Sequence, residues 1–206
     1  MSLVHLIDTI TDWARAEICA HVQLKQPPAD PEAANDARLD YKLVTPAAFG
    51  MYMPTPERLP PNILSPYPAV CVRVINGEDD AARGTGWADV QLVFCTWDTG
   101  LHGEDLILPN GDGTHRQWTG PEADAYFQRS AEGWRDAWNF MDTALRALEN
   151  ATRIGKYPID RATPIKYGPL TEQEAIPDFY PYWYAWATFR VHYPLVRNIP
   201  ELQDFL

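Results

Sequence analysis

The chain has 206 residues, of which 46% are hydrophobic and 22% are charged. This composition is enough for one sizeable core and excludes an intrinsically disordered protein. The 17 basic and 28 acidic residues give a formal net charge of −11, and no window is rich in Lys and Arg. Direct nucleic-acid binding is therefore not expected.

A helix and a proline-rich arm are expected first along the chain. Apolar residues recur at steps of three and four over residues 2–22, which predicts an amphipathic helix. Residues 26–68 then carry ten of the 19 prolines, and so many missing N–H donors exclude a regular helix or a central strand. We expect an extended arm or long loop, whose apolar residues indicate docking on a surface: Leu43, Val44, Phe49, Met51, Tyr52, Met53, Ile63 and Leu64.

Two strand patterns follow the arm. Residues 69–75 are apolar and β-branched, and residues 87–98 alternate apolar with polar side chains. The Gly-rich, charged sequence between them predicts an antiparallel hairpin with a connection longer than two residues. An insertion over residues 99–121 is expected to form a loop or a small accessory hairpin.

The last third of the chain predicts a second helix and two more strands. Large apolar residues repeat at steps of four and three over residues 130–150. Residues 156–167 contain two prolines and suit an irregular or edge strand. Residues 182–196 alternate between an apolar face and an aromatic, polar face. The whole pattern predicts a single α+β domain over residues 1–206, with about four antiparallel strands, two main helices packed on them and the Pro-rich arm.

The cysteines and the N-terminal sequence bear on the compartment. Cys19, Cys71 and Cys95 lie in apolar segments without a C-x-x-C pair, so they are expected to be buried thiols in a reducing environment. The first residues lack the basic start and apolar run of a signal peptide, and no stretch approaches the roughly 20 apolar residues of a membrane span. A cytoplasmic protein that does not bind membranes is expected.

No catalytic, cofactor or metal site is predicted. The five histidines are scattered without metal-ligand spacing, and no Ser or Cys stands in a nucleophile motif. The Gly-rich stretches lack the Lys-Ser/Thr tail of a phosphate-binding loop and are interpreted as turns. The adjacent acids Glu78, Asp79 and Asp80 raise the alternative of a Mg²⁺ or Ca²⁺ site in a metal-dependent hydrolase, but a solvated hairpin tip is the favoured interpretation.

The eight tryptophans raise another alternative, since exposed aromatic rings bind sugars. Trp13, Trp134 and Trp138 lie on the apolar faces of the expected helices, where core burial is expected. Trp97, Trp118 and Trp183 are not obviously core residues. The aromatic face of the last strand fits a subunit interface at least as well as a sugar site.

The chain resembles the tail terminator, or tail completion, proteins of long-tailed phages and prophages. The resemblance rests on four stretches in the same order: residues 59–80 (LPPNILSPYPAVCVRVINGEDD), 88–98 (ADVQLVFCTWD), 133–148 (GWRDAWNFMDTALRAL) and 180–195 (YPYWYAWATFRVHYPL). The chain departs from the family pattern in the length of its arm and in the insertion. The family has no catalytic motif, so no functional residue is carried over.

This resemblance implies a structural, non-enzymatic subunit. It implies assembly into a homo-oligomeric ring, a hexamer in members of the family, which caps the tail tube and joins it to the neck or head-completion protein. The expected location is the host cytoplasm during assembly and the tail or neck of the virion. Another neck or minor tail component and a carbohydrate-binding module remain the alternatives.

Overall fold

The computed structural model describes residues 3–27, 42–59, 65–98, 107–109, 115–117, 133–171, 176 and 179–195. In this part of the chain the α-helices are α1 (Leu3–Glu17) and α3 (Trp134–Asn150), and two 3-10 helices are η1 (Cys19–His21) and η3 (Pro56–Arg58). The strands are β1 (Leu24–Gln26), β2 (Lys42–Val44), β3 (Ala47–Gly50), β4 (Ala69–Asp80), β5 (Thr85–Trp97), β6 (Ile107–Pro109), β7 (His115–Gln117), β8 (Arg153–Ile154), β9 (Tyr157–Pro158), β10 (Lys166–Pro169) and β11 (Tyr182–Pro194). The expected α+β class is confirmed.

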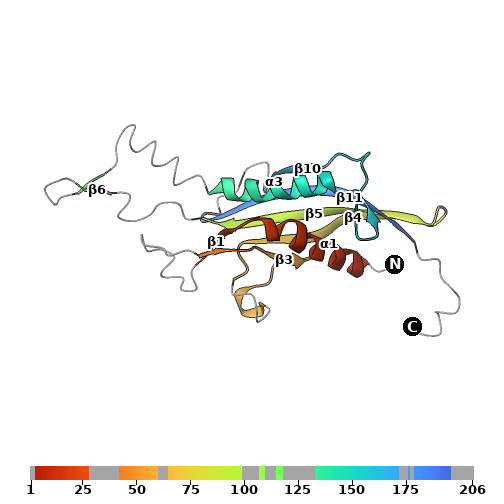
Figure 1. Ribbon diagram of the computed structural model, residues 1–206, viewed down its shortest axis with the longest axis horizontal. Coiled ribbons are helices and arrows are strands. Elements are labelled where there is room, and N and C mark those ends of the chain that lie inside the picture. The colour runs from red at the N-terminus through yellow and green to blue at the C-terminus, as the bar shows by residue number, and fades with distance from the viewer. Residues whose placement is uncertain are drawn as a thin grey trace.

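Five strands form the central sheet in the order β10-β11-β5-β4-β3 (Figure 1). The strands β4 and β5 form the predicted antiparallel hairpin, and β11 pairs antiparallel along the whole of β5. The hairpin is longer than the sequence indicated, because β4 continues to Asp80 and leaves only residues 81–84 for the turn. Pairing with β5 overrides the weak strand preference of the Gly and acidic residues in this part of β4.

The fifth strand, β3, was not predicted. It lies inside the proline-rich stretch and pairs parallel to β4, with Ala47 opposite Ala69, so the sheet is mixed and not purely antiparallel. An edge strand tolerates the neighbouring Pro46 because one side of the strand needs no ladder partner. Residues 28–41 and 60–64 of the expected arm lie outside the described residues.

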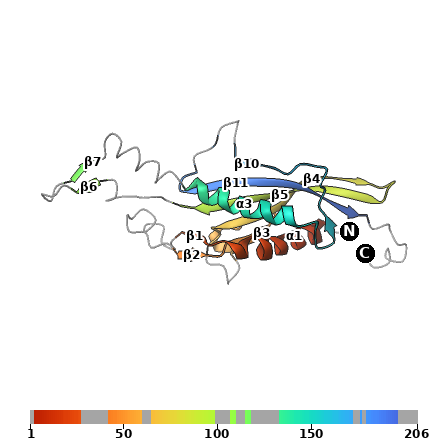
Figure 2. The ribbon, with the colours of Figure 1, turned by 45° about the horizontal axis from the view of Figure 1, so that its top comes forward.

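Both helices pack on the same face of the sheet (Figure 2). A Cβ atom on Gly50 of β3 would lie 3.0 Å from Ile7 Cγ2 of α1, so a glycine lets the helix approach the strand closely. On the same face, Phe140 of α3 packs edge to face against Phe94 of β5, with ring centroids 5.1 Å apart. Gly50 and Phe94 both lie on the sheet face defined by Val72 and Leu92. These contacts form the single hydrophobic core of the described residues.

The helical tryptophans are less buried than the sequence suggested. Trp13 and Trp138 are only partly buried against the core, while Trp134 is 42% exposed. The prediction of core burial was wrong for Trp134, because it is the first residue of α3 and its ring packs edge-on against Trp138 instead of reaching the sheet.

Smaller elements complete the described chain. Arg161, after the short β8–β9 hairpin, donates hydrogen bonds to the carbonyls of Leu148, Glu149 and Ala151 and so satisfies acceptors at the end of α3. The expected edge strand is β10, shorter and later than predicted. The accessory hairpin is present as β6 paired with β7, apart from the main sheet in both views (Figures 1 and 2). None of the described helices is long and apolar enough to cross a membrane.

Candidate functional site

The sheet face opposite the helices is the candidate site, and we call it the open face. Along β5, Ala88, Val90, Leu92 and Phe94 point to the helices and are fully buried. The intervening Asp89, Gln91 and Val93 point the other way and are only half-buried. No described helix covers that side. Because the side chains on this side of β5 are less buried than those under the helices, the open face is available for a contact.

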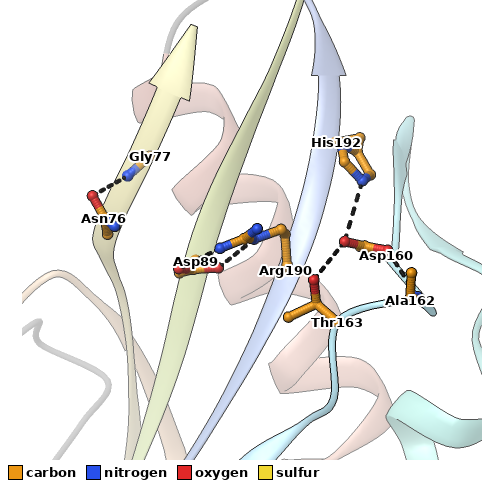
Figure 3. Close-up of polar contacts among 8 residues, drawn as sticks. All are labelled: Asn76, Gly77, Asp89, Asp160, Ala162, Thr163, Arg190 and His192. Carbon is orange, nitrogen blue, oxygen red and sulfur yellow. Dashed lines mark hydrogen bonds and ion pairs between the residues drawn. The ribbon is translucent and has the colours of Figure 1, made fainter.

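A charged pair stands in the middle of the open face. Arg190 of β11 lies directly opposite Asp89 of β5, and its guanidinium donates two hydrogen bonds to the Asp89 carboxylate at 2.7 and 3.0 Å (Figure 3). The same guanidinium stacks over the Trp87 ring, 3.6 Å from its centroid. Hydrogen bonding to Asp89 raises the pKa of Arg190. The two hydrogen bonds orient the guanidinium, which covers one face of the Trp87 ring.

One row of polar residues crosses four strands of the open face. Arg73, Gln91, Thr188 and Lys166 lie directly opposite one another across β4, β5, β11 and β10. Arg73 Nε donates to Gln91 Oε1 at 2.8 Å, and Gln91 Nε2 donates to Thr188 Oγ1 at 3.5 Å. We call this set the basic row, because a cation stands at each end of it.

His192 and Asp160 come together at the edge of this face. His192 Nε2 lies 3.5 Å from Asp160 Oδ2, and Asp160 also accepts hydrogen bonds from the Thr163 hydroxyl and the Ala162 N–H (Figure 3). The hydrogen bond from the Thr163 hydroxyl is the main cause that lowers the pKa of Asp160 below its ordinary value, and the hydrogen bond from the Ala162 N–H is the second. The Asp160 carboxylate therefore stabilises its own turn, and His192 lies beside it as a second contact of the carboxylate.

The opposite end of the open face is aromatic. The Tyr67 ring packs on Tyr182 with centroids 4.5 Å apart, and Phe179 meets Tyr184 edge to face. Burial is the main reason that the pKa of Tyr184 is raised. Beneath these rings Cys95 is fully buried. The chain's own side chains cover this end of the sheet. The part of the open face that is available for a contact is therefore the middle of the sheet and the end nearest the β4–β5 turn.

All three cysteines are buried free thiols. Burial raises the pKa of Cys19 to about 12 and also raises the pKa values of Cys71 and Cys95. A thiol with such a pKa stays protonated near neutral pH and is a poor nucleophile. The expected burial of the cysteines is confirmed.

The three adjacent acids do not converge on a cation. They end β4 instead of occupying a loop tip, and neighbouring strand residues point to opposite faces. Asp79 accepts a hydrogen bond from the Tyr193 hydroxyl on the helix side at 2.8 Å. Asp80 accepts from the Arg83 N–H and shapes the turn. Within the described residues no three His, Cys, Asp or Glu side chains are placed to hold a metal.

The tryptophans that seemed available are mostly engaged. Trp97 is 2% exposed and belongs to the interior, and Trp183 packs against the core while its Nε1 donates to the Asp98 carbonyl at 2.9 Å. Trp118 lies outside the described residues.

The basic row was not predicted from the sequence. The alternation of polar residues along each strand was visible there, but the register in which the strands pair was not.

A scan of protein-family models and a search of curated proteins found no match for this chain. The proposal of a function therefore depends on the residues and the surfaces described above.

Proposed function

We propose that the protein is a structural subunit of a long-tailed phage or prophage tail. It assembles with copies of itself into a ring on the end of the tail tube. There it stops tube growth and joins the tail tube protein to the neck or head-completion protein. It performs no catalysis and contacts neither nucleic acid nor membrane. It is made in the host cytoplasm and ends in the virion tail or neck.

The open face is the observation that carries this proposal. A sheet with helices on one face only leaves polar and aromatic side chains on the other, as antiparallel sheets do when that face is solvated or meets a partner. Here those side chains are already ordered by hydrogen bonds between strands. Ordered side chains lose little conformational entropy when a partner binds, so the face is prepared for a contact between proteins.

The shape of the molecule gives further support. Residues 76–83 of the β4–β5 hairpin are almost all exposed, and the hairpin extends beyond both helices (Figure 1). An element that projects past the body of one copy can reach a second surface on the next. Contacts between two different surfaces build rings or filaments, whereas a self-complementary surface builds closed dimers.

A different neck or minor tail component would use the same surfaces. A carbohydrate-binding module is the alternative of another class, and its sugar platforms would come from exposed rings such as Tyr52, Trp134 and Tyr167, because Arg190 covers one face of Trp87. Binding on a glycan array would favour the module over the tail subunit.

Electron microscopy of tail tubes tests the proposal. Purified protein is added to cognate tail tubes that lack an end structure, and gold-labelled protein marks its position. We expect label at one tube end and no further growth when tube protein is added. Label along the tube wall, or growth that continues unchanged, would contradict the proposal.

A further inference from the structure

The two cations of the basic row form no ion pair with the carboxylates that the structure describes. Arg73 is half-buried and donates to the neutral Gln91, and Lys166 is exposed on β10. In the described part of the chain neither forms an ion pair with a carboxylate. Other described cations, such as Arg146 and Arg153, also form no ion pair, but Arg73 and Lys166 lie in one row on the open face. The row therefore suits an acidic partner.

The same chain carries an acidic surface that suits the row. The hairpin end, residues 76–84, contains Glu78, Asp79 and Asp80 against the single cation Arg83. Glu78 is exposed and makes no ion pair or hydrogen bond to another described residue, and the Arg83–Asp80 pair at 3.4 Å is highly exposed. Exposed pairs of this kind contribute little, so the hairpin end keeps its negative character.

The hairpin end cannot reach the basic row of its own molecule. Glu78 and Arg73 lie on the same strand, about 15 Å apart at the usual rise per residue, and pairing with β5 on both sides of the bulge keeps them apart. The two surfaces can meet only between molecules. Their charges are opposite, and such complementarity speeds encounter and fixes the register of a contact.

We propose that the basic row is the docking surface for the acidic hairpin end of a second copy of this chain. The contact places Glu78 and Asp80 of one copy against Arg73 and Lys166 of the next. It joins two different surfaces, so repeating it builds the ring. The inference rests on the proposed function in that a ring needs a contact between copies.

Charge reversal tests the contact. One variant is Arg73→Glu/Lys166→Glu, and the other is Glu78→Lys/Asp80→Asn, in which Asn keeps the oxygen that holds the turn. We expect each variant alone to self-associate at least about tenfold more weakly than the wild type, measured by sedimentation velocity. An equimolar mixture should recover association, because each altered surface then meets a complementary one.

Matched controls separate this contact from overall charge. Arg146→Glu/Arg153→Glu and Asp8→Lys/Asp142→Asn make the same charge changes at exposed positions of α1, α3 and β8, and we expect association close to that of the wild type. Circular dichroism and thermal melting check that every variant is folded. If the reversed row does not fold, Arg73→Gln/Lys166→Gln takes its place and should weaken association in the same direction.

The outcomes distinguish this inference from the proposed function. Unchanged association of the row variant, or no recovery in the mixture, would overturn the inference, as would a wild type that never self-associates. A charge-dependent species of only two copies would support the contact and count against the ring. A ring that forms and caps tubes regardless of these charges would support the function and overturn the inference.

Discussion

Val90 and Val93 provide a matched test of which sheet face is covered. Both are valines of the central strand β5, but Val90 is fully buried under the helices and Val93 is half-buried on the open face. Val→Ala removes two carbons, and at about 0.8 kcal/mol for each buried carbon the transfer loss at Val90 is about 1.6 kcal/mol. A residual cavity raises the expected cost to about 2–3 kcal/mol. At Val93 the cost should stay below about 1 kcal/mol, because water or neighbouring side chains replace the methyl groups.

Urea denaturation followed by tryptophan fluorescence measures both changes. Loss of strand preference is nearly equal at the two positions, so it cancels in the comparison. The protein is kept dilute, so that a second copy does not cover Val93. Equal costs at the two positions, or a larger cost for Val93→Ala, would show that the open face is covered and refute the reasoning.

Three further outcomes are expected. Because the folded pKa of Asp160 lies below its ordinary value of 3.8, its stabilising effect is present above that value and is lost as pH falls through the folded pKa. Asp160→Asn should therefore flatten the acid-side fall of Tm below about pH 4, whereas Asp142→Asn on α3 should leave it unchanged; equal curves for the wild type and Asp160→Asn would contradict this. The buried cysteines should not react with Ellman's reagent in the native protein and should all react in concentrated urea, so rapid native labelling of any thiol would contradict their burial. Gly133→Ala should lower Tm, because a Cβ atom at this position would clash with the indole ring of Trp183, and a wild-type Tm would show that this approach is not tight.

Much of the fold was predictable because hydrophobic periodicity is a local property. The period of α3, the alternation of β5 and the two faces of β11 all appear in single segments, and each is confirmed. The strand β3 was missed because four residues among prolines carry no period of their own. Only tertiary pairing with β4 makes them a strand.

The candidate site was less predictable, for a physical reason. Arg73, Gln91, Thr188 and Lys166 are far apart in the sequence and become neighbours only through the register of three strand pairs. That register depends on the core packing of the whole sheet. The bulge between Val74 and Asn76 also shifts which residues of β4 share the open face. Neither feature can be read from one segment.

Light scattering coupled to size exclusion, over a range of concentrations, is the most direct measurement of the central claim that copies of this chain assemble with one another. The account predicts a discrete ring-sized species that grows at the expense of the monomer as concentration rises. A monomer at every concentration would contradict it.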